Sequence, residues 1–292
     1  MSEFEQYWKS RLRFVDVHYH ASPDSFERRY HAVEAGRLYA RYGGGCVLKN
    51  HLGSVTALAS ICQQMELPVF GSIVLNEIAG GICTQPIKQA LCQYQFPHQG
   101  RLLVHLPTVV TSSHRSVMSR KMANNSVENF AQVPLRIVGN DGKLLPALQS
   151  LLHFSQEQDI VISTGHASRE EIYSLLEQVD KMGGGCRVML NQPANPITGM
   201  VAEELISLGH HDWLYIEQTA LTVLLGYQSF EDFSVVLSSV PNLLYSSDLG
   251  QSCQIDIPEW LKQSKMWFEK IGLSKSRQKD ICLHTPLTML AP

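Results

Sequence analysis

Two histidines, His18 and His20, lie one residue apart at the end of the apolar run FVDVHYH, residues 14–20. Apolar and polar residues alternate along this run, which predicts a short strand on which both imidazoles point to the same side. Two imidazole nitrogens on one side can bind one divalent metal ion, because imidazole is a common ligand for such metals. The pair is therefore a candidate metal site. The alternative is that both are hydrogen-bonded histidines of the strand with no ligand.

Other short apolar runs of the chain also end in residues that can bind a metal, donate a proton or hold a polar substrate. In chain order these residues are His18 and His20, Lys49 and His51, Asn76, Thr108, His166, Gln192, Glu217 and Asp248. If the runs are parallel strands of one barrel, their ends gather on one face, where the loops after the strands build the active site. The sequence therefore predicts one polar site assembled from residues far apart in the chain.

Each of these residues also has a structural interpretation. His166 and Asp248 could cap the helices that follow their strands, because polar residues there satisfy exposed backbone donors. Glu217 and Gln192 could lie on the rim of the site, and Lys49 could be a solvated charge or hold an anion. The residue types alone therefore do not separate ligands from caps and rim residues.

The elements that must position these residues are predicted to be eight strands separated by helices. The strands are expected near residues 14–20, 45–51, 69–75, 102–108, 160–166, 186–191, 213–218 and 242–248. Helical patterns lie between them, and Ser168 with Glu171 forms a capping box at the start of one helix. Alternating strands and helices without a change of composition predict a single α/β domain over residues 1–292, a (β/α)8 TIM barrel.

A polar insertion at residues 109–145 follows the fourth strand. Arg115 lies in its first part and is, by position, a candidate for substrate binding. The second part, LRIVGNDGKLL, predicts a hairpin, because GNDG between short apolar runs is a strong turn signal. An insertion on this side of a barrel often covers the site, which favours a lid-like segment; an ordinary surface excursion is the alternative.

Composition and charge limit the classes of partner. The chain has 292 residues, of which 44% are hydrophobic and 17% charged, and a net charge of -3. This balance gives no electrostatic reason to expect a nucleic acid or a membrane surface, so a small molecule is the expected substrate and a homo-oligomer is left open. Seven scattered cysteines without a CxxC pair, and an N-terminus without an apolar stretch, favour a cytoplasmic protein with reduced thiols.

The order of the candidate residues resembles the amidohydrolase superfamily of metal-dependent barrel hydrolases: a His-x-His pair on the first strand, a histidine on the fifth and an aspartate on the eighth. More closely, VDVHYHASPD, VLKNH, STGHAS and SSDLGQ look like a branch of unknown function with a DxHxHxxPD start and a KNH second strand. The resemblance covers residues from about 14 to 290. It implies an amidohydrolase-like barrel with a hydrolase activity that depends on a metal.

The resemblance also implies roles for the matching residues. The implied metal ligands are His18, His20, His166 and Asp248. Asp248 would in addition accept a proton from the attacking water. Lys49 and His51 match the KNH motif and would line the site, where they could stabilise negative charge on the substrate. Asp248, His51 and Lys49 are therefore the expected catalytic residues, and Lys49 is also a candidate for substrate binding.

Two positions depart from the superfamily pattern. The sixth strand usually ends in a histidine, where this chain has Gln192, and the fourth strand offers Thr108 where many relatives have a residue that bridges two metals. One divalent ion is therefore expected, with zinc as the first choice and manganese, iron or nickel as alternatives. Gln192 and Glu217 are expected to contact the substrate.

These expectations describe a metal-dependent hydrolase of small molecules. A divalent ion lowers the pKa of bound water from about 15.7 towards about 7, and the resulting hydroxide would attack the carbonyl of an amide, lactone or ester, or a related electrophile. One alternative is a metal-dependent decarboxylase or lyase. A second is a degenerate barrel that binds a ligand without catalysis, which the replacement by Gln192 supports.

Overall fold

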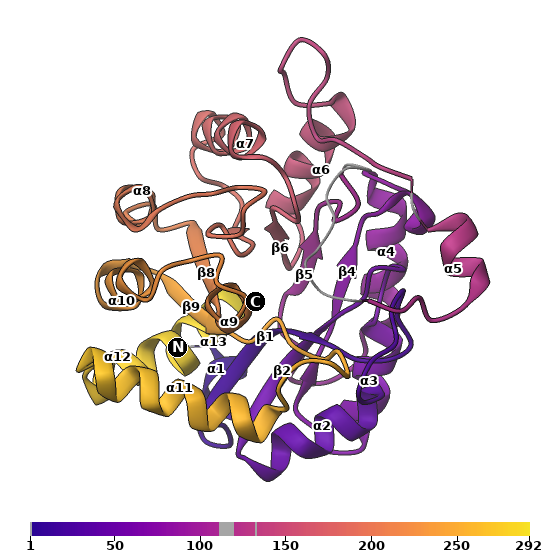
Figure 1. The fold of residues 1–292 in the computed structure, drawn as a ribbon. Helices are drawn as coiled ribbons and strands as arrows, with labels where there is room; N and C mark the ends of the chain where they lie inside the picture. The colour runs from indigo at the N-terminus through magenta and orange to yellow at the C-terminus, as the bar shows by residue number, and fades with distance from the viewer. Residues whose placement is uncertain (1, 111–119, 132) are drawn as a thin grey trace.

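The computed structural model describes residues 2–110, 120–131 and 133–292, so Arg115 lies outside the described residues (Figure 1). The strands are β1 (Phe14–His20), β2 (Gly44–Lys49), β3 (Val69–Phe70), β4 (Ser72–Val74), β5 (Leu102–His105), β6 (Ile160–Ser163), β7 (Val188–Leu190), β8 (Leu214–Thr219) and β9 (Leu243–Ser246). All pairs between neighbouring strands are parallel. The expected α/β fold with parallel strands is confirmed, and the third expected strand is divided into β3 and β4.

The strands form two sheets, one with the order β1-β2-β3 and one with the order β4-β5-β6-β7-β8-β9. Gly71 alone separates β3 from β4. A parallel bridge joins Tyr19 of β1 to Leu249, just beyond the end of β9. The pairing therefore establishes two parallel sheets, and their closure into one barrel stays a prediction.

One helix precedes β1, and the other helices follow the strands along the chain and surround the sheets (Figure 1). They are α1 (Glu3–Lys9), α2 (Ala32–Arg41), α3 (Thr56–Gln64), α4 (Thr84–Gln93), α5 (Asn125–Phe130), α6 (Pro146–Gln156), α7 (Arg169–Lys181), α8 (Ala202–Leu208), α9 (Ala220–Leu224), α10 (Phe230–Ser239), α11 (Ile257–Ile271), α12 (Lys275–Lys279) and α13 (Thr285–Leu290). The capping box at the start of α7 is confirmed, since Glu171 N donates to Ser168 Oγ at 3.3 Å. Within the described residues, no helix combines the length and apolarity needed to cross a membrane.

One face of the strands changes from apolar to polar along the strand direction. The buried residue pairs that show this are Val47 and Lys49 on β2, Leu103 and His105 on β5, Val161 and Ser163 on β6, Tyr215 and Glu217 on β8, and Leu244 and Ser246 on β9. Members of a pair share a face, because successive side chains of a strand alternate. The apolar members form one cluster with Phe4 and Trp8 of α1 and Leu287 of α13. The polar members therefore meet beyond this cluster, towards the C-terminal ends of the strands.

The insertion at residues 109–145 contacts the loop that follows β1. Phe26 of this loop and Met122 of the insertion form an antiparallel bridge. Further along the insertion, Val138 and Leu144 form a second antiparallel bridge, which confirms the predicted hairpin. The segment around Met122 thus packs on the loop after β1, and Val109, Val110, Arg120 and Ala131 of the insertion line the cavity at the polar strand ends.

Candidate metal centre

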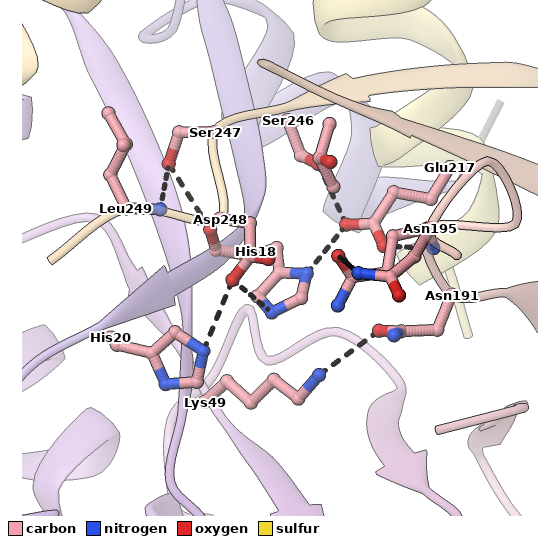
Figure 2. A network of polar contacts seen from close by, with 12 residues as sticks. His18, His20, Lys49, Asn191, Asn195, Glu217, Ser246, Ser247, Asp248 and Leu249 are labelled. Atoms are coloured by element: carbon pink, nitrogen blue, oxygen red, sulfur yellow. Dashed lines mark hydrogen bonds and ion pairs between the residues drawn. The ribbon is translucent and has the colours of Figure 1, made fainter. Parts of the chain in front are cut away.

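His18 and His20 lie at the C-terminal end of β1, next to Asp248, which follows β9 (Figure 2). His18 Nε2 is 3.0 Å from Asp248 Oδ1, and His20 Nε2 is 3.4 Å from the same oxygen. The backbone holds Asp248 in this position, since its N–H donates to His18 O at 2.9 Å. All three residues are buried, and their potential ligand atoms lie within 4.8 Å of one another. Residues from the two ends of the chain thus form one potential metal site.

Glu217 on β8 orients the imidazole of His18. Its Oε1 accepts hydrogen bonds from His18 Nδ1 at 3.0 Å and from Ser246 Oγ at 2.7 Å, and its Oε2 accepts one from Gln192 N at 2.9 Å. A carboxylate on Nδ1 keeps the proton there and leaves the lone pair of Nε2 for a metal. His18 Nε2 is buried and faces Asp248 Oδ1 at 3.0 Å, without a hydrogen bond of regular geometry to a described residue. The donor set therefore fits a divalent ion.

A second group of potential ligands, His20, Asp24 and His51, shares His20 with the first. The Asp24 carboxylate is already occupied, because Oδ2 accepts from Arg28 Nε at 2.8 Å and from Arg28 Nη2 at 2.5 Å, and Oδ1 accepts from His51 N at 2.8 Å. A cation at this position would compete with the guanidinium group. Asp24 Oδ2 is also 3.3 Å from His20 Nδ1, so Asp24 can orient His20 in the way that Glu217 orients His18.

The charges of the centre determine its protonation. Burial by itself would lower the pKa of His18, but the carboxylates of Asp248 and Glu217 raise it to about 9. Burial, helped by Arg28, lowers the pKa of His20 to about 3. Burial would raise the pKa of Asp248, yet His18 and His20 hold it well below its usual value. Without a metal, the centre at neutral pH therefore has a protonated His18, a neutral His20 and an ionised Asp248.

We expect the metal-free protein to release about one proton when it binds zinc at pH 7, because His18 must lose a proton before Nε2 can bind the ion. Since the pKa of His18 is raised to about 9, the apparent zinc affinity should rise on the order of tenfold per pH unit between pH 6.5 and 8.5. Calorimetric titration in two buffers with different ionisation enthalpies counts the released protons. An affinity that is constant over this pH range would contradict the expectation.

The potential metal ligands face a cavity of about 160 Å³. Its walls contain most of the residues that the sequence singled out, namely His18, His20, Lys49, His51, Thr108, His166, Gln192 and Asp248. Glu217 is buried and is not among the lining residues. The structure thus brings the strand-end residues together in one cavity and leaves Glu217 behind His18.

His166 lines this cavity but belongs to neither group of potential metal ligands among the described residues. Its Nε2 is 3.4 Å from Nε2 of Gln192. Gln192 has a φ of 39° and Asp248 a φ of 53°, a left-handed backbone region that is unfavourable for residues other than glycine. Two strained residues beside one cavity are typical of a functional site.

Neither His166 nor Asp248 caps the helix that follows it. The N-cap of α7 is Ser168 and the N-cap of α11 is Asp256, each of which accepts a hydrogen bond from a backbone N–H of its helix. The capping interpretation of both residues is therefore wrong.

Lys49 is buried on β2 beside the candidate metal centre. Its Nζ donates to Asn191 Oδ1 at 3.1 Å (Figure 2), and Asn191 Nδ2 in turn donates to Gly165 O at 3.0 Å. Burial lowers the pKa of Lys49, while the carboxylates of Asp248 and Glu217 oppose this shift. Lys49 is therefore not a solvated rim charge, but a buried donor directed into the site.

A family model described as Family of unknown function (DUF6282) matches residues 13–217. The chain belongs to this family. No curated protein matches the chain. Among solved structures, this DUF6282 protein is similar to Amidohydrolase 2 from Bifidobacterium longum subsp. infantis, with 11% sequence identity, a TM-score of 0.46, and coverage of 95% of this chain and 98% of that chain.

Sequence reasoning assigned no role to four residues that the structure of this DUF6282 protein places at the site: Asp16, Asp24, Arg28 and Arg120. Both aspartates belong to the DxHxHxxPD pattern, which is the signal that could have found them. Asp16 is fully buried and accepts hydrogen bonds from Tyr39 Oη at 2.5 Å, Ser247 N at 3.0 Å and His18 N at 3.1 Å. It thereby connects the strand that carries the histidines to the segment that carries Asp248.

Proposed function

We propose that this DUF6282 protein is a metal-dependent hydrolase of the amidohydrolase type that acts on a small molecule. The observation that carries the proposal is the orientation of His18 and His20, each of which has a carboxylate near Nδ1 and Asp248 near Nε2. Histidine ligands of metals are commonly oriented by a carboxylate on the other ring nitrogen. We propose accordingly that Glu217 and Asp24 position the two imidazoles, so that Glu217 acts on His18 instead of on the substrate.

The proposed architecture is one eight-stranded (β/α)8 barrel in a single domain over residues 1–292. Two hydrogen bonds between β1 and the segment after β9 support closure: His20 N donates to Leu249 O, and Asp248 N donates to His18 O, both at 2.9 Å. At the other junction between the two sheets, Gly71 is the single residue between the end of β3 and the start of β4. In such a barrel the polar strand ends form the active site.

The proposed metal site consists of His18, His20 and Asp248, with His166 beside it in the same cavity. Zinc suits a set of histidines and a carboxylate, and manganese, iron or nickel also accept such ligands. One divalent ion held there would supply a Lewis acid and a water molecule of lowered pKa. The proposal does not require a second ion, because Arg28 already binds the carboxylate of the second group.

The remaining chemistry belongs to the side chains around this site. Asp248 Oδ1 is the oxygen that faces both histidines, which leaves Oδ2 to accept a proton from water and pass it to the leaving group. Lys49 and His51 line the same cavity and can stabilise negative charge on the substrate. Gln192 and His166, also in the lining, can contact the substrate through an amide and an imidazole.

The proposal can be tested with protein that is stripped of metal and reloaded with zinc or manganese. We expect short esters, lactones or amides to be converted only by the reloaded protein, with oxygen from labelled water in the acid product. Asp248→Asn should lower turnover by about 100-fold or more, because the proton acceptor is lost. Asp180→Asn, at an exposed position of α7, should have no effect and serves as the matched control.

Two results would contradict the hydrolase. Product that contains no oxygen from labelled water would indicate a decarboxylase or lyase at the same metal site. A protein that retains no metal after reloading would indicate a barrel that binds a ligand without catalysis.

A further inference from the structure

The cavity at the proposed metal site has a lining with more cationic than anionic groups. Arg28, Lys49 and Arg120 contribute guanidinium or ammonium groups, and Asp248 is the one carboxylate residue among the described lining residues. The positive charge of Arg28 is balanced by the carboxylate of Asp24, which accepts two hydrogen bonds from the guanidinium group. Lys49 is hydrogen-bonded to a neutral amide. Before any metal is counted, the cavity therefore favours a negatively charged ligand.

Arg120 is the cationic group that the fold leaves available for a ligand. Within the described part of the chain it has no ion pair, and its guanidinium carbon lies 5.1 Å from the centre of the Phe26 ring. A guanidinium group that stacks on an aromatic ring keeps its N–H groups free for hydrogen bonds to a planar or tetrahedral anion. Arg120 thus combines a cavity position with unused donors.

The backbone around Arg120 is fixed by the loop after β1. Glu27 N donates to Lys121 O at 3.0 Å, and Ala123 N donates to Ser25 O at 2.9 Å. Lys121 also forms an ion pair with Glu27 on the outer surface. Both residues are exposed, but they differ in position: Arg120 lines the cavity, whereas Lys121 is not among the lining residues and pairs with Glu27.

Another part of the lining is apolar. It consists of Val109, Val110, Ala131, Ile197, Leu221 and Leu225. Tyr227 lies in the same lining, and its hydroxyl group has no hydrogen bond to a described residue. The cavity thus offers a short apolar surface together with a guanidinium and a phenol donor.

We propose that the substrate is a small anion with a short apolar portion, and that Arg120 binds its carboxylate or phosphate group. Bidentate hydrogen bonds from a guanidinium suit both anions. Tyr227 is placed to add a third donor, and the apolar portion packs on the aliphatic side chains of the lining. This inference rests on the proposed function, because it names the substrate class of the same site.

The test measures binding of isobutyrate, of its neutral analogue isobutyramide and of inorganic phosphate to the full chain by calorimetry or ligand-observed NMR. We expect isobutyrate to bind at least about tenfold more tightly than isobutyramide, and Arg120→Met to lower the affinity for the anion by about tenfold or more. Arg120→Lys should be intermediate, because it keeps the charge and loses the bidentate geometry. Lys121→Met is the matched control and should bind like the wild type.

The metal content and melting temperature of each variant are measured in the same samples. An anion affinity that is unchanged in Arg120→Met would overturn the proposal, since the anion would then bind elsewhere. An affinity that falls while metal content and melting temperature stay constant supports it, and the ratio between phosphate and isobutyrate shows which anion the site prefers. If the protein binds no metal but isobutyrate binding still depends on Arg120, the anion subsite stands and the hydrolase proposal fails.

Discussion

Protein purified without chelator is expected to carry close to one divalent ion per chain, and the His18→Ala/His20→Ala variant less than about a tenth of that amount. The two substitutions remove both imidazoles of the proposed ligand set and leave Asp248 alone, and one carboxylate is a weak site for a transition metal. Elemental mass spectrometry on both proteins, before and after dialysis against zinc or manganese, measures the effect.

The control for this comparison is His153→Ala/His210→Ala, which removes two exposed histidines far from β1 in the chain. This variant should keep the metal content of the wild type. A wild type without metal after dialysis, or equal metal contents in the two double variants, would rule out the proposed centre.

Asp16→Ala is expected to lower the free energy of unfolding by about 3 kcal/mol or more, because it leaves buried donors without an acceptor. Asp16 accepts hydrogen bonds from Tyr39 Oη, His18 N and Ser247 N, and all of these groups are buried. Each unsatisfied buried donor costs about 1–3 kcal/mol, and water that enters the space left by the carboxylate reduces the sum. Urea unfolding followed by fluorescence measures the change.

Two further variants make the stability comparison specific. Asp180→Ala, at an exposed position of α7, should change the free energy of unfolding by less than about 0.5 kcal/mol. Asp16→Asn should lower the free energy of unfolding by less than Asp16→Ala does, because the amide oxygen still accepts hydrogen bonds. If Asp16→Ala were as stable as Asp180→Ala, the carboxylate would not hold β1 to the segment after β9.

The strands could be predicted from the sequence because their signal is local. The alternation that predicts β1 is contained in seven consecutive residues, and the run that predicts β9 is similarly short. The third strand was predicted as continuous, but Gly71 divides it; a Cβ atom there would lie 3.0 Å from Thr56 Cγ2 of α3, a contact that depends on how the helix packs. The position of such breaks is therefore set by tertiary neighbours.

The candidate site could be predicted only in its outline. His18, His20 and Asp248 were singled out from their strand ends, and the parallel arrangement of the strands brings such ends together. His166 was expected among the ligands, yet it lies in neither group of potential ligand atoms, because the reach of a side chain depends on the exact path of its loop. Arg115, which falls outside the described residues, keeps its role as a candidate for substrate binding only as a prediction.

By itself, the sequence determined the parallel α/β fold and the residues that gather at the strand ends, because these follow from local alternation and from chain order. Only the tertiary structure decided what each side chain contacts. Glu217 lies 199 residues from His18 in the chain, yet its carboxylate binds the imidazole, and Arg120 reaches the cavity because backbone hydrogen bonds dock the insertion on the loop after β1. Such contacts depend on strand register and loop docking, which are set by packing across the whole fold and leave no local pattern.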